Sequence, residues 1–268
     1  MLQSVAVPGS LPEVHRLLSA NEGAVLIAGG TVVMPVANAG TDDFSALVSL
    51  RRAGLGGISI EDGKATIGAA TPLSDLEASD ALAFLRPALD AIASPTIRNM
   101  ATVGGNLFAK APYGDFAACL IALGATATIA GPAGSRIEAV ERTVAGIGRD
   151  EVVTQLSFAL PAAGAFRFAK AGRKALNSAA VVTVAAVVTV ADATVADCRI
   201  GLGGVASHAI RATSAETALE GKPFDRAHVE AAGEAALADI DPADDAYASA
   251  WYRRRVTPVH FRRALLGQ

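Results

Sequence analysis

The sequence predicts an α+β fold built from two domains, and three observations support this prediction. The chain has 268 residues, more than the ~100–200 residues of a typical single domain. The segment 161–164, Pro-Ala-Ala-Gly, has the composition of a linker and divides residues 1–162 from residues 163–268. Short helical and extended patterns alternate before this linker, whereas long extended runs precede helical ones after it, as in a separate α+β unit.

The first part of the N-terminal domain covers about residues 1–55 and alternates between helical and extended patterns. Pro12 suits the first turn of a helix, and a short apolar run leads directly into Gly29 and Gly30. Pro35 interrupts the apolar residues that follow, which favours only a short helix or a turn. The expected elements are a helix over 11–20, a strand over 24–28, a short helix or turn over 32–36 and a strand over 46–50.

The second part of this domain, residues 56–162, combines a hairpin with several helices. The pair Asp62-Gly63 is a hairpin-turn signal, and Thr71 followed by Pro72 is typical of an N-cap and the first helical position. Pro95 disfavours the helical conformation at the residue before it, so a helix is expected to end there. The expected elements are strands over 57–60 and 65–67, helices over 72–78, 82–92 and 115–123, and a strand over 125–130.

The C-terminal domain contains a long apolar stretch, residues 179–191, that carries no charge. This stretch is shorter than the ~20 residues that a helix needs to cross a membrane. Its valine and threonine residues favour a strand, because β-branched side chains pack well on a pleated sheet. We therefore expect a buried core strand. The other expected elements are a strand over 198–205 and helices over 214–219 and 226–238.

The composition excludes several classes of protein. A formal net charge of −3 argues against a nucleic-acid interface, which needs a basic excess. Cys119 and Cys198 are the two cysteines and no CxxC occurs, while the four histidines lack metal-binding spacing. We therefore expect neither a disulfide framework nor a metal or iron–sulfur centre held by this chain. The N-terminus lacks the regions of a secretory signal, so a cytoplasmic location without a membrane span is expected.

Two glycine loops carry the chemistry that the sequence reveals. These are residues 28–31, Ala-Gly-Gly-Thr, which follow an apolar run, and residues 102–106, Thr-Val-Gly-Gly-Asn. Consecutive glycines permit positive φ angles and allow backbone N–H groups to converge on phosphate oxygens. Arg98 and Lys110 are the candidate cations for balancing phosphate charge. Neither loop matches GxGxxG or a P-loop, which disfavours those nucleotide folds, and the two loops are expected to share one cleft.

Asp115 allows two interpretations. Its carboxylate follows the second loop and can accept hydrogen bonds from the ribose or ribityl hydroxyls of a nucleotide. Alternatively, Asp115 caps the N-terminus of the helix that begins near it, a frequent role of aspartate. The residues alone favour the capping role.

Residues 94–127, SPTIRNMATVGGNLFAKAPYGDFAACLIALGATA, closely resemble the second flavin-binding segment of a known family. This family comprises the FAD-binding medium subunits of molybdenum hydroxylases, which include xanthine, carbon monoxide and nicotinate dehydrogenases. IRN, TVGGN and the aspartate of YGD occur in the family's order and spacing. The resemblance extends over nearly the whole chain through LIAGGT (26–31), IGAATPLSDLE (67–77), FAKAGRKALNSAAVVTVAA (168–186), RIGLGGVA (199–206), AETALEGK (215–222) and SAWYRR (249–254).

The resemblance implies a two-part FAD-binding domain of the vanillyl-alcohol-oxidase-like type, followed by a C-terminal α+β domain of the carbon monoxide dehydrogenase flavoprotein type. It implies that the two glycine loops hold the FAD diphosphate, that Asp115 contacts the FAD hydroxyls and that Lys170 lies near the isoalloxazine ring. It implies no catalytic acid or base and no metal ligand on this chain. The implied FAD-binding residues are Leu26, Ile27, Ala28, Gly29, Gly30, Thr31, Val32, Val33, Ile92, Ala93, Ala101, Thr102, Gly104, Gly105, Asn106, Phe108, Ala109, Gly114, Asp115 and Lys170.

The function implied by the resemblance is electron transfer within a heteromeric molybdenum hydroxylase. Electrons would arrive from [2Fe–2S] clusters on a small subunit and leave through FAD to an external acceptor. Hydroxylation would take place at the molybdopterin of a large subunit, and the complex would be a dimer of heterotrimers. Two alternatives remain, a stand-alone flavin-dependent oxidoreductase and a flavin-free structural subunit.

Two features depart from the family pattern or fall outside it. Val32 occupies a position where many relatives have aspartate or another polar residue, so the first loop is expected to act through its backbone. The extra cysteines that bind a [4Fe–4S] centre in some relatives are missing, and Cys119 is expected to be an inert core thiol. The arginines of 253–255 and 262–263 predict a solvated helix face. A less favoured interpretation is a subunit contact that includes Trp251 and Tyr252.

Overall fold

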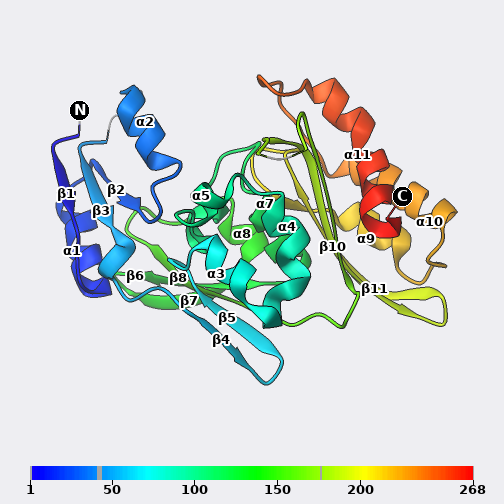
Figure 1. The fold of residues 1–268 in the computed structure, drawn as a ribbon, viewed down its shortest axis with the longest axis horizontal. Coiled ribbons are helices and arrows are strands. Elements are labelled where there is room, and N and C mark those ends of the chain that lie inside the picture. Colours follow the sequence, from blue (N-terminus) through cyan, green and yellow to red (C-terminus); the bar gives the residue numbers. More distant parts are fainter. Residues whose placement is uncertain (1, 41–43, 176, 268) are drawn as a thin grey trace.

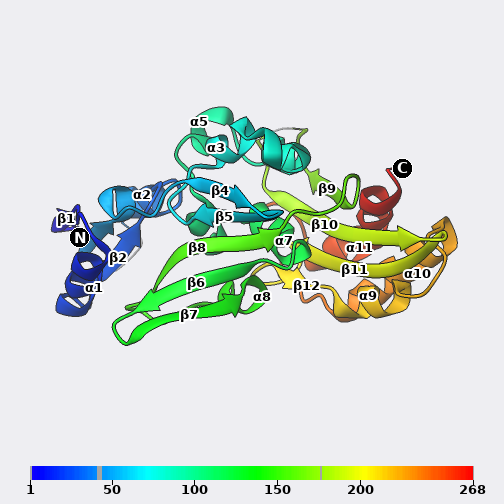
Figure 2. The same cartoon turned by 90° about the horizontal axis from the view of Figure 1, so that it is seen from below.

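The structure, a computed structural model, describes residues 2–40, 44–175 and 177–267. Figure 1 shows an elongated molecule in which three β-sheets follow one another along the longest axis, each with its own helices. Seen from below, the middle and C-terminal sheets approach each other near helix α7 (Asp115–Ala122) (Figure 2). Helices and sheets are therefore grouped as the α+β prediction requires.

The N-terminal sheet contains three parallel strands in the order β1-β3-β2. Val14 and Leu18 of α1 are buried in one cluster with Val48 of the sheet, because side chains four residues apart share a helix face. The predicted helix and strands of this region are confirmed. The elements are β1 (Ser4–Ala6), α1 (Leu11–Ala20), β2 (Ala24–Ile27), α2 (Val33–Ala39), β3 (Ala46–Ser49) and the 3₁₀-helix η1 (Leu50–Arg52).

The middle sheet has five antiparallel strands in the order β4-β5-β8-β6-β7. The predicted hairpin is confirmed, since the first two of these strands pair around Asp62 and Gly63, which both have positive φ. Positive φ at both turn residues is what a two-residue hairpin turn requires. The strands are β4 (Ile58–Glu61), β5 (Lys64–Gly68), β6 (Thr126–Gly131), β7 (Gly134–Ala139) and β8 (Val152–Ala159).

Short helices cover one side of the middle sheet (Figure 2), and two predictions about them are wrong. Pro72, not Thr71, is the N-cap residue of α3, because the Thr71 hydroxyl is already hydrogen-bonded to the backbone of Gly57 at 3.0 Å. The single helix expected over 82–92 is divided, since Pro87 cannot donate a helical hydrogen bond. The helices are α3 (Leu73–Ala78), η2 (Asp80–Leu85), α4 (Arg86–Asp90), α5 (Pro95–Arg98), α6 (Val103–Leu107), α7 and α8 (Val140–Thr143).

The C-terminal sheet has four antiparallel strands in the order β12-β11-β10-β9. The apolar run forms β10 as predicted, and its residues are buried from Ala180 to Ala186, while the last three are exposed. No helix in the described part of the chain is long and apolar enough to cross a membrane. The elements are β9 (Phe166–Gly172), β10 (Ala180–Ala191), β11 (Thr194–Gly203), β12 (Ile210–Arg211), α9 (Thr213–Leu219), α10 (Arg226–Ala235), η3 (Ala236–Ala238) and α11 (Ala250–Leu266).

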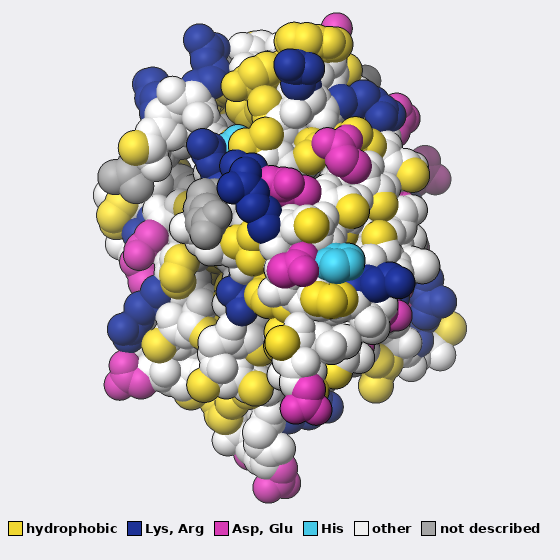
Figure 3. Space-filling model, turned by 90° about the vertical axis from the view of Figure 1, so that its right-hand side faces the viewer, with side chains coloured by type: hydrophobic (Ala, Val, Ile, Leu, Met, Phe, Trp, Pro, Cys, Tyr) yellow, Lys and Arg dark blue, Asp and Glu magenta, His cyan; other side chains and the backbone are white. Residues whose placement is uncertain are grey.

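The arginines of α11 do not form one solvated face. Arg253 is 1% exposed, and its guanidinium donates to three backbone carbonyl oxygens and to Asp245 at 2.6 Å. Arg254 donates to the carbonyl oxygens of Leu237 and Ile240. The prediction of a solvated face is therefore wrong for Arg253. Figure 3 shows this end of the molecule, where basic, acidic and hydrophobic side chains are intermixed.

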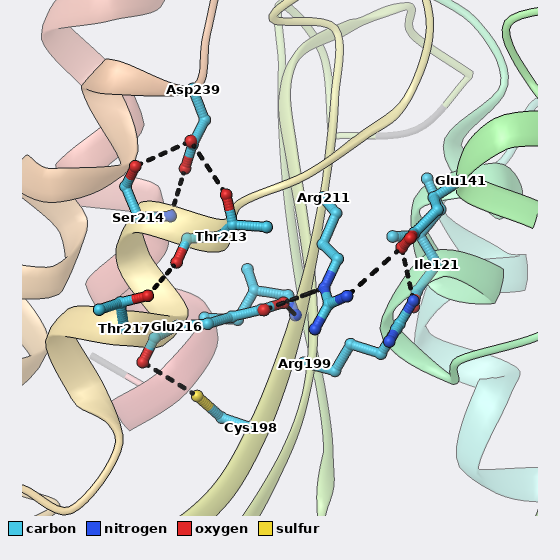
Figure 4. A network of polar contacts seen from close by, with 11 residues as sticks. Ile121, Glu141, Cys198, Arg199, Arg211, Thr213, Ser214, Glu216, Thr217 and Asp239 are labelled. Carbon is cyan, nitrogen blue, oxygen red and sulfur yellow. Dashed lines mark hydrogen bonds and ion pairs between the residues drawn. The ribbon is translucent and has the colours of Figure 1, made fainter. Parts of the chain in front are cut away.

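Helix α7 connects the middle of the molecule to the C-terminal sheet, and every residue of this helix is buried. A Cβ on Gly201 of β11 would overlap the carbonyl oxygen of Ala118, so the strand and the helix touch through their backbones. Figure 4 shows a polar network at the same junction. Arg199 donates to the Ile121 carbonyl at 2.8 Å and to Glu141 at 2.5 Å. The helix is thus held by packing and by charge.

Candidate functional site

Two neighbouring cavities meet at the predicted glycine loops. The first has a volume of about 530 Å³ and the second about 810 Å³, both within the range of small-molecule sites. They share the lining residues Thr31, Val32, Ala101 and Asn106. The expectation that the two loops lie in one cleft is therefore met by their geometry.

The structure brings most of the predicted site residues to these cavities. Ile27 and Ala109 are the exceptions, since neither lines the described cavities. The predicted residues that line the first cavity are Leu26, Ala28, Gly29, Gly30, Thr31, Val32, Val33, Ala101, Thr102, Gly104, Gly105, Asn106 and Phe108. Those that line the second cavity are Thr31, Val32, Ile92, Ala93, Ala101, Asn106, Gly114, Asp115 and Lys170.

The glycines allow the loops to touch. A Cβ on Gly29 would overlap the carbonyl oxygen of Met100, just before the second loop. Gly104 donates its N–H to the Ala69 carbonyl at 2.8 Å, and a Cβ there would lie 2.8 Å from the Ala69 side chain. Gly30 has a φ of +72°, which side chains disfavour. A larger residue at Gly29 or Gly104 would therefore separate the segments that form the cleft.

The second glycine loop is helical in the structure, since Val103–Leu107 form α6, and two side chains fix its conformation. Thr102 is the N-cap residue of α6, and its hydroxyl oxygen accepts from the Gly105 N–H at 3.2 Å. Asn106 uses its Oδ1 atom to accept from the Phe116 N–H at 3.1 Å, in the first turn of α7. Since the amide oxygen of Asn106 is engaged in this way, its NH₂ group is the part that remains to donate to a ligand in the shared wall.

Asp115 does not cap α7, so that interpretation is wrong. Gly114, with a φ of +86°, is the N-cap residue, and Asp115 is the first residue of the helix. The Oδ2 atom of Asp115 accepts from Lys170 Nζ at 2.7 Å, and its Oδ1 atom accepts from the Thr183 hydroxyl. The side chains of Asp115 and Lys170 are each 7% exposed. The structure thus contains a buried ion pair at the wall of the second cavity.

The cations expected near the phosphates lie elsewhere. Arg98 is buried and donates to Glu77 at 2.9 and 3.0 Å and to the Ile92 carbonyl at 3.0 Å. Its hydrogen bond and charge hold the pKa of Glu77 below the usual range. Lys110 does not line either of the described cavities. Arg98 therefore links α5 to α3 and to the segment at Ile92. The expectation that Arg98 and Lys110 balance phosphate charge is not supported.

Other basic residues line the cavities, and sequence reasoning missed them. Arg149 lines the first cavity and donates to the Leu18 and Asn21 carbonyls at 3.2 and 2.6 Å, which closes the C-terminal end of α1. Arg173 and Lys174 line the second cavity. Arg173 and Lys174 follow Lys170 within the FAKAGRK segment, and this proximity could have identified them from the sequence. Arg149 belongs to no recognisable motif.

Two tyrosines join the N-terminal and C-terminal regions at the wall of the second cavity. Tyr113, in the loop before α7, and Tyr247, in the loop before α11, have hydroxyl groups 2.6 Å apart. The hydrogen bond that Tyr113 shares with Tyr247, followed by burial, raises the pKa of Tyr113 to about 12. The wall of the second cavity is therefore built from both halves of the chain.

The two cavities suit a dinucleotide whose diphosphate lies between two ring systems. The first glycine loop provides backbone N–H groups where the cavities meet, which favours phosphate oxygens. A ring at each end can occupy the cavity on its side, and FAD has this arrangement. Among the residues that the structure describes, no group of acidic, histidine or cysteine side chains can hold a metal ion. The fold and the site together define a dinucleotide-binding protein.

Comparison with known proteins gives the family. Residues 2–161 match the FAD binding domain in molybdopterin dehydrogenase, and residues 166–267 match the CO dehydrogenase flavoprotein C-terminal domain. The chain therefore belongs to the FAD-binding family of molybdopterin dehydrogenases. These matches confirm the predicted family, the fold class, the FAD cofactor and the assignment as an oxidoreductase subunit.

Individual relatives are similar over nearly their whole length. The carbon monoxide dehydrogenase medium chain of Afipia carboxidovorans is 32% identical over 96% of this chain and 93% of its own. The xanthine dehydrogenase FAD-binding subunit of Escherichia coli O157:H7 is 30% identical over 91% of this chain and 88% of its own. A solved carbon monoxide dehydrogenase from Hydrogenophaga pseudoflava has a TM-score of 0.94 at 31% identity, covering 99% of this chain and 96% of that chain.

Proposed function

We propose that this chain accepts electrons from [2Fe–2S] clusters on a small partner subunit and passes them through FAD to an external acceptor. A large molybdopterin-containing subunit would carry out the hydroxylation. The observation that carries this proposal is the pair of cavities joined at two glycine loops, within a chain that matches medium chains over nearly its whole length. The assembly is a dimer of heterotrimers in the cytoplasm. Within this chain, the two domains are residues 1–162 and 163–268.

The residues of the two loops are proposed to hold the diphosphate. The N–H groups near Gly29 and Gly30 would bind its oxygens, and the amide NH₂ of Asn106 would donate at the junction of the cavities. The apolar first cavity suits the adenine end. The second cavity, which contains the buried ion pair, suits the ribityl chain and the isoalloxazine ring.

The protein contributes binding, orientation and electrostatics. FAD, when bound, supplies a carrier that exchanges one or two electrons. Lys170 presents a fixed positive charge at the wall of the second cavity, and Asp115 orients that charge while offering an acceptor to ligand hydroxyls. Ile92 and Ala93 form an apolar part of the same wall that limits contact with water.

Purification tests this proposal. We expect the full chain to carry flavin, visible in its absorption spectrum, or to take up FAD when it is added, and to copurify with a molybdopterin subunit and an iron–sulfur subunit when all are expressed together. A flavin-loaded chain that oxidises a small substrate without partners would instead support the stand-alone oxidoreductase. A chain that assembles with partners yet never binds FAD would support the structural subunit.

A further inference from the structure

Thr183 is a polar residue inside the buried, apolar part of β10. It is 0% exposed, and its neighbours in the strand are valine and alanine. Burying a hydroxyl group is costly unless it forms a hydrogen bond. The Thr183 hydroxyl donates to Oδ1 of Asp115, so the hydroxyl is directed at the ion pair in the second cavity.

The strand register places Thr183 beside Lys170. The two residues are direct partners between β10 and β9, so their side chains leave the same face of the sheet. Asp115 reaches this face from the first position of α7 and is bonded to both residues, one through each carboxylate oxygen. The three side chains therefore form one contact between helix and sheet, in which each oxygen of Asp115 has a different donor.

Lys170 extends this contact to the cavity wall. Its Nζ atom also donates to the carbonyl oxygen of Ala91, at 2.9 Å, just before the wall residues Ile92 and Ala93. The position of the ammonium group thus depends on how the Asp115 carboxylate is turned. A carboxylate that lost its Thr183 donor would be free to rotate and to present both oxygens to Lys170.

We propose that Thr183 is a positioning residue for the FAD site: it holds one oxygen of Asp115 so that the other sets the place of the Lys170 ammonium group. This inference rests on the proposed function, since it assumes that FAD occupies the second cavity. A buried ion pair is stable only when further hydrogen bonds satisfy its remaining atoms. Thr183 provides such a bond from a rigid strand and does not itself need to touch the cofactor.

The test compares substitutions that keep or remove the hydroxyl. Thr183→Val preserves shape without the donor, and Thr183→Ser keeps the donor. Thr189→Val is the matched control, because Thr189 lies on the same strand and is exposed. FAD affinity is measured by fluorescence titration of the full chain, purified with whatever subunits assemble with it and stripped of flavin. The midpoint potential of the bound flavin is measured on the same samples.

We expect Thr183→Val to raise the FAD dissociation constant about tenfold, since a hydrogen bond to a charged group contributes free energy on that order. The midpoint potential should shift as well, because a cation near the flavin changes position. Thr183→Ser should restore both values, and Thr189→Val should leave both unchanged. Should Thr183→Val not fold, Thr183→Ala removes the same hydroxyl without introducing a new methyl contact.

Two outcomes would overturn the inference. The first is a Thr183→Val protein whose FAD affinity and midpoint potential equal those of the wild type. The second is a Thr183→Ser protein whose FAD affinity is as low as that of Thr183→Val, which would indicate a packing role alone. A wild-type protein that binds no FAD would contradict the proposed function itself, so the two failures are distinguishable.

Discussion

Gly29 lies against Met100 so closely that a Cβ on the glycine would overlap the methionine carbonyl oxygen. This backbone contact joins the first glycine loop to the segment just before the second loop. The contact therefore sets the distance between the two loops at the point where the cavities meet.

Gly29→Ala is expected to abolish FAD binding, because the loops must separate to make room for the methyl group. Overpacking of this kind costs about 1–3 kcal/mol of folding free energy, so the protein should still fold. FAD titration and thermal unfolding measure the two effects. Gly9→Ala is the control, since no atom lies within 4 Å of a Cβ at that position. Retained FAD affinity in Gly29→Ala would show that the contact is dispensable.

Asn106→Asp is expected to separate stability from cofactor binding. Aspartate keeps an acceptor for the Phe116 N–H and adds a negative charge near the start of α7, which a helix N-terminus favours. The same charge would face the diphosphate in place of an NH₂ donor, so FAD affinity should fall at least about tenfold. The melting temperature without FAD should stay at or above that of the wild type. A large loss of melting temperature with normal FAD affinity would contradict this assignment.

Lys170→Met is expected to destabilise the protein, because it leaves Asp115 buried without its cation. Removing one partner of a buried ion pair costs about 3–5 kcal/mol. The double variant Lys170→Met/Asp115→Asn removes the uncompensated charge and should recover much of this stability without recovering FAD affinity. Chemical denaturation of the flavin-free chain measures the first effect and titration measures the second. Equal stability of the single and double variants would contradict the ion pair.

The contact between Tyr113 and Tyr247 is expected to weaken at alkaline pH. The pKa of Tyr113 is raised from 10.0 to about 12, so the folded state favours the neutral phenol. The stability gained is complete below pH 10 and is lost as the pH rises through about 12. The free energy of unfolding, measured against pH, should therefore be larger for the wild type than for Tyr113→Phe at neutral pH. This difference should disappear in alkali. Tyr252→Phe, at an exposed tyrosine of α11, is the matched control.

The elements and loops that depend on local signals were predictable. The two glycine pairs marked the cleft, and the Asp62-Gly63 pair marked the hairpin. The bonds of Asp115 were not predictable from its own segment, because their partners come from β9 and β10, far along the chain. The cluster of arginines also predicted Arg253 as solvated, since a run of charged residues does not reveal that backbone carbonyls converge on that position.

The same limit applies to the cavity walls. Arg149 and Tyr247 belong to loops with no recognisable motif, and only the packing of β8 and α11 brings these loops to the cleft. The glycine contacts, by contrast, involve segments that carry a recognisable Gly-Gly motif. The sequence therefore identified the glycine segments of the site better than the loops of Arg149 and Tyr247.

The burial of the whole of α7 has a consequence for how this chain can be divided. The helix places Asp115 at the wall of the second cavity, while its other side chains pack into the core of the middle region and against β10 and β11. A fragment ending at the linker would expose the surface that β10 and β11 cover and would lack Lys170 and Thr183. Such a fragment is expected to retain FAD poorly, because both partners of the Asp115 carboxylate lie in the missing part of the chain.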